Sequence, residues 1–425
     1  MRVLPDHMIK KTGKLKSGIY LKIKLSTLNV RQLLTSLTPG LITAALIFGP
    51  SKMTITSKLG AQFGYSLLWI VGVAIFFMCF FSNMAVRIGM ALDKSVLTVV
   101  AEKFGRKAAI ALGVCIFIVC ASFQSGNSTG VGISLGELTD TSPVIWVVIV
   151  NALSILLLFT KNIYKMLERV MISLIAIMLL SFVVTFIIVK PEAKAMAEGL
   201  VPRIPDGSLG LVIAFGASFI SIVGAFYQAY LVNEKRKASK GKPVKYDSVF
   251  GILVLGTLSV IVMICAAVVL HPAGIKVTKA TDMSLALIPA FGKSASYVFL
   301  IGLFGAAFSS LIGNASAGGT LLSDAIGKSS KVGGATSRWL TAAIIIVGAV
   351  ISIIFGSAPL QLIVLAQSIT IFIVPVIGFT LFYVSNNKAL MGSYVNTVWM
   401  KLVIGTGMAL IVIMAFFNFK ELFLK

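Results

Sequence analysis

The sequence predicts an all-α polytopic membrane protein, and three observations lead to that prediction. Of the 425 residues, 58% are apolar and only 12% are charged, whereas a soluble domain is about 45–50% apolar and about 25% charged. Apolar stretches of about 20 residues, the length that crosses a bilayer, follow one another from Leu37 to Phe417. Lys and Arg gather in every second segment between these stretches. A soluble globular protein is therefore excluded.

The apolar stretches predict eleven spans in one domain. They lie near residues 38–66, 67–91, 108–135, 142–160, 165–189, 208–232, 248–270, 294–323, 339–355, 360–384 and 397–417. The residues before the first span are basic. We therefore expect a basic cytoplasmic N-terminal segment at 1–36 and a single transmembrane domain at 37–425.

The charge distribution predicts the orientation in the membrane. Lys and Arg number 37 against 14 Asp and Glu, and 27 of the 37 cations fall in segments that are cytoplasmic if the N-terminus is inside. This asymmetry follows the positive-inside rule, so orientation and contact with anionic lipid explain the basic excess without nucleic-acid binding. We expect a multi-pass protein of the plasma membrane, with its N-terminus in the cytoplasm and its C-terminus outside.

No residue pattern indicates an enzyme, a cofactor or a metal centre. The four cysteines all lie in apolar spans and form no CxxC pair, so neither a zinc site nor a disulfide framework is indicated. The two histidines, His7 and His271, belong to no group of three metal-type ligands in the sequence. HExxH and P-loop motifs are missing from the sequence. We therefore expect no enzymatic activity, no cofactor and no metal-ligating residues.

Two predicted spans contain helix-breaking residues near their middle. Gly49, Pro50 and Ser51 interrupt the first span, and the sixth span contains Gly216 and Gly224 but no proline. Broken backbone at membrane depth normally lines a protected cavity, and two broken helices five spans apart are typical of inverted-repeat transporters with a substrate site at the midplane. The alternative is a simple proline kink in one helix of a bundle.

Three segments resemble one family of transporters. GAQFGYSLLW (Gly60–Trp69), EGLVPRIPDGS (Glu198–Ser208) and GLFGAAFSSLIGNASAGG (Gly302–Gly319) are similar to the NRAMP family of divalent-metal transporters. The resemblance covers nearly the whole chain from Thr38 to the eleventh span. It implies a LeuT-type fold, with two inverted five-helix repeats plus an eleventh helix, in which the first and sixth helices are broken around the substrate.

The chain departs from this family at the residues that bind metal. The family's Asp-Pro-Gly-Asn motif in the first helix is replaced here by Gly49, Pro50, Ser51 and Lys52. The family's Met-Pro-His motif in the sixth helix aligns with Ala225, Phe226 and Tyr227. The resemblance therefore implies an inherited fold whose metal ligands are lost.

The aligned polar positions of the third and tenth helices differ as well. The family's two proton-pathway carboxylates align with Gln124 and Asn127. The first family glutamine of the tenth helix is kept as Gln367, whereas the second aligns with Ile373. All fourteen acidic residues fall in loops, tails or span ends, so no carboxylate is predicted at the midplane, where a hard cation would need oxygen ligands.

Lys52 is predicted to be the only basic residue deep in a span, which makes it a functional candidate. In one reading its ammonium, the Ser51 hydroxyl and the backbone amides of the broken helices face an anion. In a second reading Lys52 extends toward the outer surface or is neutral. In a third it replaces the coupling cation and titrates during transport.

These considerations give two sets of candidate residues. The predicted substrate-binding residues are Gly49, Pro50, Ser51, Lys52, Gly224, Ala225, Tyr227, Gln228, Gln367 and Thr370. The predicted coupling or polar pathway contains Gln124, Asn127, Ser309, Ser310 and Asn314. Small and hydroxyl residues also allow membrane helices to pack closely, so each one alone has a structural alternative.

The leading hypothesis is an NRAMP-related secondary transporter of a small anion, such as bicarbonate or a small carboxylate. The alternative is a divalent-metal transporter that holds hydrated Mg²⁺ or Mn²⁺ through neutral oxygens, and a second alternative is a transporter-like sensor. The expected partners are a small inorganic or organic ion as substrate and the lipid bilayer. Under this hypothesis a coupling ion, Na⁺ or H⁺, can drive the transport.

Overall fold

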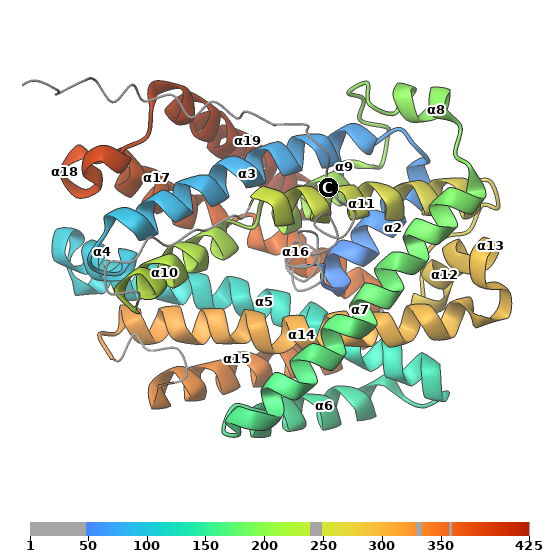
Figure 1. Ribbon diagram of the computed structural model, residues 1–425, viewed down its shortest axis with the longest axis horizontal. Coiled ribbons are helices and arrows are strands. Elements are labelled where there is room, and N and C mark those ends of the chain that lie inside the picture. The colour runs from blue at the N-terminus through green and yellow to red at the C-terminus, as the bar shows by residue number, and fades with distance from the viewer. Residues whose placement is uncertain (1–47, 239–248, 329–333, 357–358, 425) are drawn as a thin grey trace, which may run out of the picture. The chain divides into compact units, whose positions relative to one another are not determined.

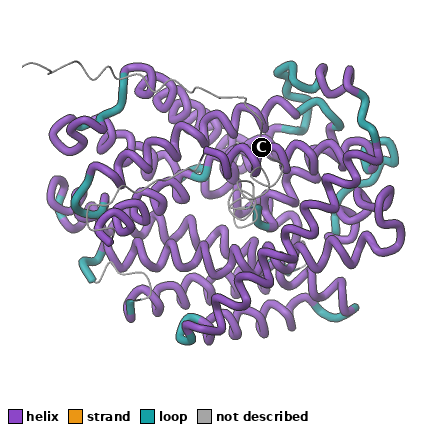
Figure 2. The backbone as a smooth tube through the Cα atoms, in the orientation of Figure 1, coloured by secondary structure: helices purple, strands orange, loops and turns teal. Residues whose placement is uncertain are grey.

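The structure is a computed structural model that describes residues 48–238, 249–328, 334–356 and 359–424. All of these residues belong to the unit Pro39–Lys425, whereas the predicted basic segment 1–36 lies outside the described residues. Every regular element within the described ranges is a helix (Figure 2). The all-α class predicted from the sequence is therefore confirmed.

Each of the eleven predicted spans contains at least one helix. The helices are α2 (Pro50–Phe63), α3 (Leu68–Ala91), α4 (Val96–Phe104), α5 (Arg106–Thr139), α6 (Pro143–Leu157), α7 (Lys161–Val189), α8 (Ala193–Glu198), α9 (Leu209–Ile220), α10 (Ile222–Ala238), α11 (Val249–Val269), α12 (Ala280–Ser284), α13 (Ile288–Phe291), α14 (Ala295–Ala325), α15 (Ala335–Ile354), α16 (Pro359–Thr370), α17 (Val374–Asn386), α18 (Lys388–Met391) and α19 (Val398–Phe423). The short helices α4, α8, α12, α13 and α18 lie in the connections between spans.

Most of these helices have the length and composition of membrane spans. Within the described residues, eight helical segments are long and apolar enough to cross a bilayer, or nine if the bent pair α16–α17 is one span. The remaining predicted spans correspond to α2, described from Pro50 and 14 residues long, and to α6 with 15 residues. Leu156 on α6 and Ile187 on α7 are 62% and 65% exposed, as expected for side chains that face lipid.

The two longest helices form the centre of the packing. Figure 1 shows α5 and α14 running side by side, with α15 packed against both and α6 against α5. Their close approach depends on small residues: a Cβ atom added to Gly318 of α14 would lie 2.7 Å from the Cβ of Cys120 on α5. Gly318 therefore allows the backbones of α5 and α14 to meet, and the α5 face carries polar residues to the site.

The break in the sixth span follows the prediction with a shift, and in the first span α2 begins at the predicted break. In the first span, Gly49 is extended and α2 begins at Pro50, where a proline loses no helical hydrogen bond. In the sixth span, the break between α9 and α10 lies at Ser221, which has a left-handed backbone with φ 46°. A Cβ atom on Gly224 would lie 2.5 Å from the Ser221 hydroxyl. Gly224 thus accommodates the break without being its hinge.

The tenth span differs from the prediction of one continuous helix over 360–384. It divides into α16 and α17, which meet at an angle of 42°. Pro375 is the second residue of α17, and it has no N–H to donate to the turn before it. The break lies just after Thr370, so the end of α16 that carries Gln367 and Thr370 is not collinear with α17.

Another close approach fixes α2 against α11. A Cβ atom on Gly60 would lie 2.2 Å from the Met263 carbonyl oxygen and 2.9 Å from the Ala266 Cβ. The first of these neighbours is backbone, so it has no rotamer by which to move away. Gly60 therefore sets the distance between the C-terminal part of α2 and α11.

We predict that Gly60→Ala lowers the stability of the purified protein by about 1–3 kcal/mol, the usual cost of overpacking. The measurement is the apparent melting temperature in detergent. Gly72→Ala in α3 is the matched control, because a Cβ there meets nothing within 4 Å and alanine is the better helix former. Equal melting temperatures for Gly60→Ala and wild type would contradict the close approach.

Candidate functional site

The backbone at the break of the first span lies against two other helices. A Cβ atom on Gly49 would lie 2.7 Å from the Ser310 hydroxyl of α14 and 3.9 Å from the Asn127 Oδ1 of α5. A Cβ atom on Gly130 of α5 would lie 2.7 Å from the ring of Pro50. The extended residue and the first turn of α2 are therefore enclosed by polar and small residues of α5 and α14.

The Ser51 hydroxyl joins this break to the tenth span. The Gln367 Nε2 of α16 donates a hydrogen bond of 2.9 Å to the Ser51 Oγ, and both residues are buried. A Cβ atom on Gly126 of α5 would lie only 3.1 Å from the same hydroxyl. Thr370 supports this arrangement from within α16, because its hydroxyl donates to the Gln367 carbonyl oxygen at 2.7 Å. Three helices thus converge on Ser51.

Lys52 makes a different contact from that of Ser51. Its side chain is buried, and its Nζ lies 5.5 Å from the centroid of the Phe219 ring on α9. Phe219 in turn stacks on Phe215, with ring centroids 4.1 Å apart. Among the described residues, no carboxylate lies within ion-pair distance of Lys52. The ammonium is therefore held by an aromatic face, an arrangement that stabilises a desolvated cation by up to about 2 kcal/mol.

The predicted polar pathway is divided between the break and the helix contacts around it. Asn127 and Ser310 lie at Gly49, as described above. Gln124 accepts a 3.4 Å hydrogen bond from Asn127, and its buried Nε2 has no partner among the described residues. Asn314 donates to the Cys120 carbonyl oxygen at 2.8 Å, so its contact joins α14 to α5. Ser309 is half-buried on α14.

The predicted residues of the sixth span lie beyond the break, on α10. The Ala225 amide donates to the Ser221 carbonyl oxygen at 2.9 Å. Gln228 accepts a 2.7 Å hydrogen bond from Ser82 of α3, and the ring of Tyr227 stacks with that of Tyr230 at 5.9 Å. Gln228 is thus hydrogen-bonded to α3, whereas Ser51 is hydrogen-bonded to α16. The assignment of the α10 residues to substrate binding stays a prediction.

The sequence-based search missed two polar residues of α2. Lys58 is as buried as Lys52, at 8% exposure each, so α2 carries two buried lysines. The part of α2 near Lys58 packs against α11. Thr54 is fully buried, and its hydroxyl has no hydrogen-bond partner in the described part of the chain. Ser51, Thr54 and Lys58 recur at the spacing of one helix face, a signal that is visible in the sequence.

The described residues contain no group of three or more His, Cys, Asp or Glu side chains placed to hold a metal ion. The atoms at the break are instead neutral: hydroxyls of Ser51 and Ser310 and amides of Asn127 and Gln367. Such a set can hydrogen-bond a polar solute or the water shell of an ion. It adds no negative charge of its own.

Comparison with known proteins identifies the family. The sequence model described as "Natural resistance-associated macrophage protein-like" matches residues 40–419. The divalent metal cation transporter MntH of Pectobacterium carotovorum is 24% identical over 392 residues, covering 89% of this chain and 90% of that protein. The protein of the same name in Yersinia pestis is 25% identical over 388 residues, covering 88% and 90%.

Solved structures share the fold. A mutant of the manganese transporter of Eremococcus coleocola aligns with a TM-score of 0.71 at 18% identity, covering 92% of this chain and 87% of that one. Mhp1, a transporter of the nucleobase-cation-symport-1 family, aligns with a TM-score of 0.51 at 14% identity, covering 90% and 92%. The broken spans described above fit the LeuT-type architecture of these transporters. The chain therefore belongs to the NRAMP family and is a multi-pass membrane transporter rather than an enzyme.

Proposed function

We propose that the chain transports a divalent metal cation, Mg²⁺ or Mn²⁺, across the plasma membrane. The family membership and the names of the two bacterial relatives support this alternative over the anion hypothesis. The single observation that carries the proposal is the Ser51–Gln367 hydrogen bond. It joins neutral polar side chains of the first and tenth spans at the helix break, and transporters of this fold class bind their substrates at such breaks.

The chemistry of the side chains at the break is suited to a hydrated ion. Mg²⁺ gives up its waters reluctantly and usually keeps several of them in protein sites. The hydroxyls of Ser51 and Ser310 and the amides of Asn127 and Gln367 can bind those waters. No thioether, thiolate or imidazole is among them, so softer transition metals lack the ligands they prefer.

Lys52 is the main obstacle to this proposal, and its contact with Phe219 reduces the conflict. A protonated lysine repels a cation, and the effect increases as the two approach each other. The Nζ lies over an aromatic ring of α9, whereas the Ser51 hydroxyl points to α16. The ammonium and the neutral oxygens are thus engaged with different helices.

The second candidate function is transport of a small anion, and one observation favours it. Lys52 is buried without a carboxylate partner among the described residues. A monoanion that entered from the break would neutralise this ammonium and receive hydrogen bonds from Ser51 and backbone amides. The two candidates make opposite predictions for the loss of the lysine charge.

Uptake into proteoliposomes tests the first candidate. We predict saturable uptake of Mg²⁺ or Mn²⁺, which Ser51→Ala and Gln367→Ala each reduce about tenfold, as expected for the loss of one buried hydrogen-bonding group. Ser173→Ala is the matched control, because Ser173 is exposed on α7 and bonds only within its own helix. Saturable uptake of bicarbonate or formate, with no metal uptake, would contradict the proposal.

The charge of Lys52 separates the two candidates. For a metal cation, we predict that Lys52→Met lowers the KM about tenfold or more, because the repulsion is removed. For an anion, the same variant abolishes uptake. Lys58→Met is the control: Lys58 has the same 8% exposure and lies about 9 Å further along α2. If Lys52→Met and Lys58→Met changed uptake to the same extent, the position of the charge next to the break would not be the cause of the change.

A further inference from the structure

A buried carboxylate lies at the C-terminal end of α14, outside the site at the break. Among the described residues, Asp324 is the one Asp or Glu that is buried, with an exposure of 5%. Its Oδ2 has no hydrogen-bond partner in the described ranges, and no cation there lies within ion-pair distance of it. The end of α14 that carries it is the end predicted to face the cytoplasm. A buried carboxylate without an ion pair is costly in its charged form.

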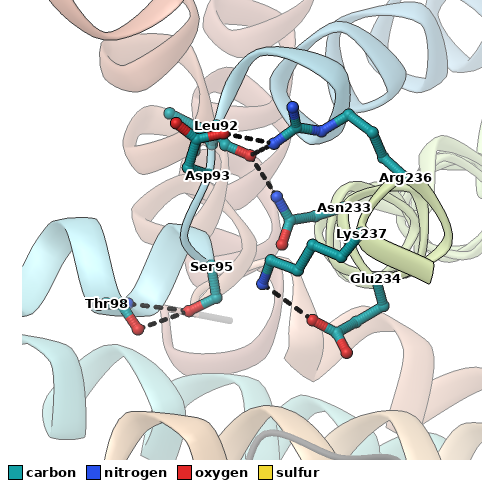
Figure 3. A network of polar contacts seen from close by, with 8 residues as sticks. All are labelled: Leu92, Asp93, Ser95, Thr98, Asn233, Glu234, Arg236 and Lys237. Carbon is teal, nitrogen blue, oxygen red and sulfur yellow. Dashed lines mark hydrogen bonds and ion pairs between the residues drawn. The ribbon is translucent and has the colours of Figure 1, made fainter. Parts of the chain in front are cut away.

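Charged and polar groups of three other helices face Asp324. Ser95 at the start of α4, Arg106 at the start of α5, and Glu234 and Lys237 of α10 all interact with its carboxyl. Both cations have other partners: the Lys237 Nζ bonds Glu234 at 3.0 Å, and the Arg106 Nη1 donates to the Ala325 carbonyl oxygen at 3.2 Å. Figure 3 shows the Lys237–Glu234 pair together with the Ser95–Thr98 hydrogen bonds. Neither cation therefore forms an ion pair with Asp324.

A second unpartnered polar atom belongs to the same cluster. Tyr230 of α10 is 2% exposed, and its hydroxyl has no hydrogen-bond partner among the described residues. It interacts electrostatically with Asp324 and with Glu234. A carboxylate can only accept hydrogen bonds, whereas a carboxylic acid can also donate one. One added proton would remove the buried charge of Asp324 and give it a donor for a neighbouring oxygen.

We propose that Asp324 is a proton-binding site of this transporter. The Oδ2 accepts one proton from water as an O–H bond, and it returns that proton to water when the bond breaks. Glu234 and Lys237 give the cluster a route to the aqueous side, because their side chains are 33% and 43% exposed. A divalent cation is a poorer occupant, since Arg106 and Lys237 face the same carboxyl. Proton binding does not depend on the transported substrate; only its coupling to transport rests on the proposed function.

Infrared difference spectroscopy on the full chain in lipid tests proton binding directly. We expect the pH-difference spectrum to contain the C=O stretch of a protonated carboxylic acid, and we expect Asp324→Asn to remove it. Asp93→Asn is the matched control, because Asp93 lies at the same end and its side chain is 91% exposed. The Arg236 guanidinium beside Asp93 holds the pKa of that carboxyl below its usual range, so this variant keeps the band.

Three outcomes would overturn the proposal: no protonated band at any pH, a band that survives in Asp324→Asn, or a band that only Mn²⁺ or Mg²⁺ displaces at constant pH. The last of these would make Asp324 a cation site. If Asp324→Asn does not fold, Asp324→Glu keeps the carboxyl and is expected to shift the band.

Transport then tests the use of the proton. In proteoliposomes, Asp324→Asn is expected to lose the dependence of metal uptake on a pH gradient, whereas Asp324→Glu keeps it. A gradient dependence that is unchanged in Asp324→Asn would reject coupling through this residue. If no metal is transported by any variant, the infrared result still decides proton binding, and the failure belongs to the proposed function.

Discussion

The packing around the site depends on one constraint. Where a helix is broken inside a membrane, its backbone N–H and C=O groups must find hydrogen-bond partners within the protein. Gly49 is extended just before α2 begins at Pro50, and lipid offers no partner for backbone groups outside a helix. Small residues of α5 meet this need by allowing close contact, since Gly126 and Gly130 leave room for Ser51 and Pro50. Gln367 then completes the enclosure from α16. The same enclosure that protects the backbone also brings polar atoms together where a substrate can bind.

Much of the fold could be predicted because its determinants are local in the sequence. The apolar stretches are long, and a proline within such a stretch, here Pro50, indicates a kink or break in the helix. The break at Ser221 has no such local signal, because a serine in an apolar helix is ordinary and its left-handed backbone depends on tertiary packing. The bend after Thr370 had a signal in Pro375. That proline lies five residues beyond the Gln367–Thr370 segment, however, and is equally compatible with the first turn of a separate helix.

The candidate site could be predicted only in part, because its contacts join residues that are far apart in the chain. Ser51 and Gln367 are separated by 316 positions, and only the fold shows that they bond. The resemblance to a family indicated both positions, but it did not indicate that Gln228 bonds to Ser82. Nor could composition show that Lys52 lies over Phe219. The residues of a site can thus be named from aligned positions, whereas their division between substrate contact and helix packing depends on geometry.

The buried charges limit what this transporter can carry. A divalent ion 4 Å from a protonated lysine is repelled by about 8 kcal/mol at an effective dielectric of 20, and by about 4 kcal/mol at 8 Å. Neutral hydroxyls and amides cannot offset the larger value, because each contributes about 1 kcal/mol. Metal transport through the break therefore requires that the Lys52 ammonium stay on the Phe219 ring or lose its proton while the ion is bound. Asp324 cannot offset this repulsion, because it lies about 21 Å along α14 from Ser310.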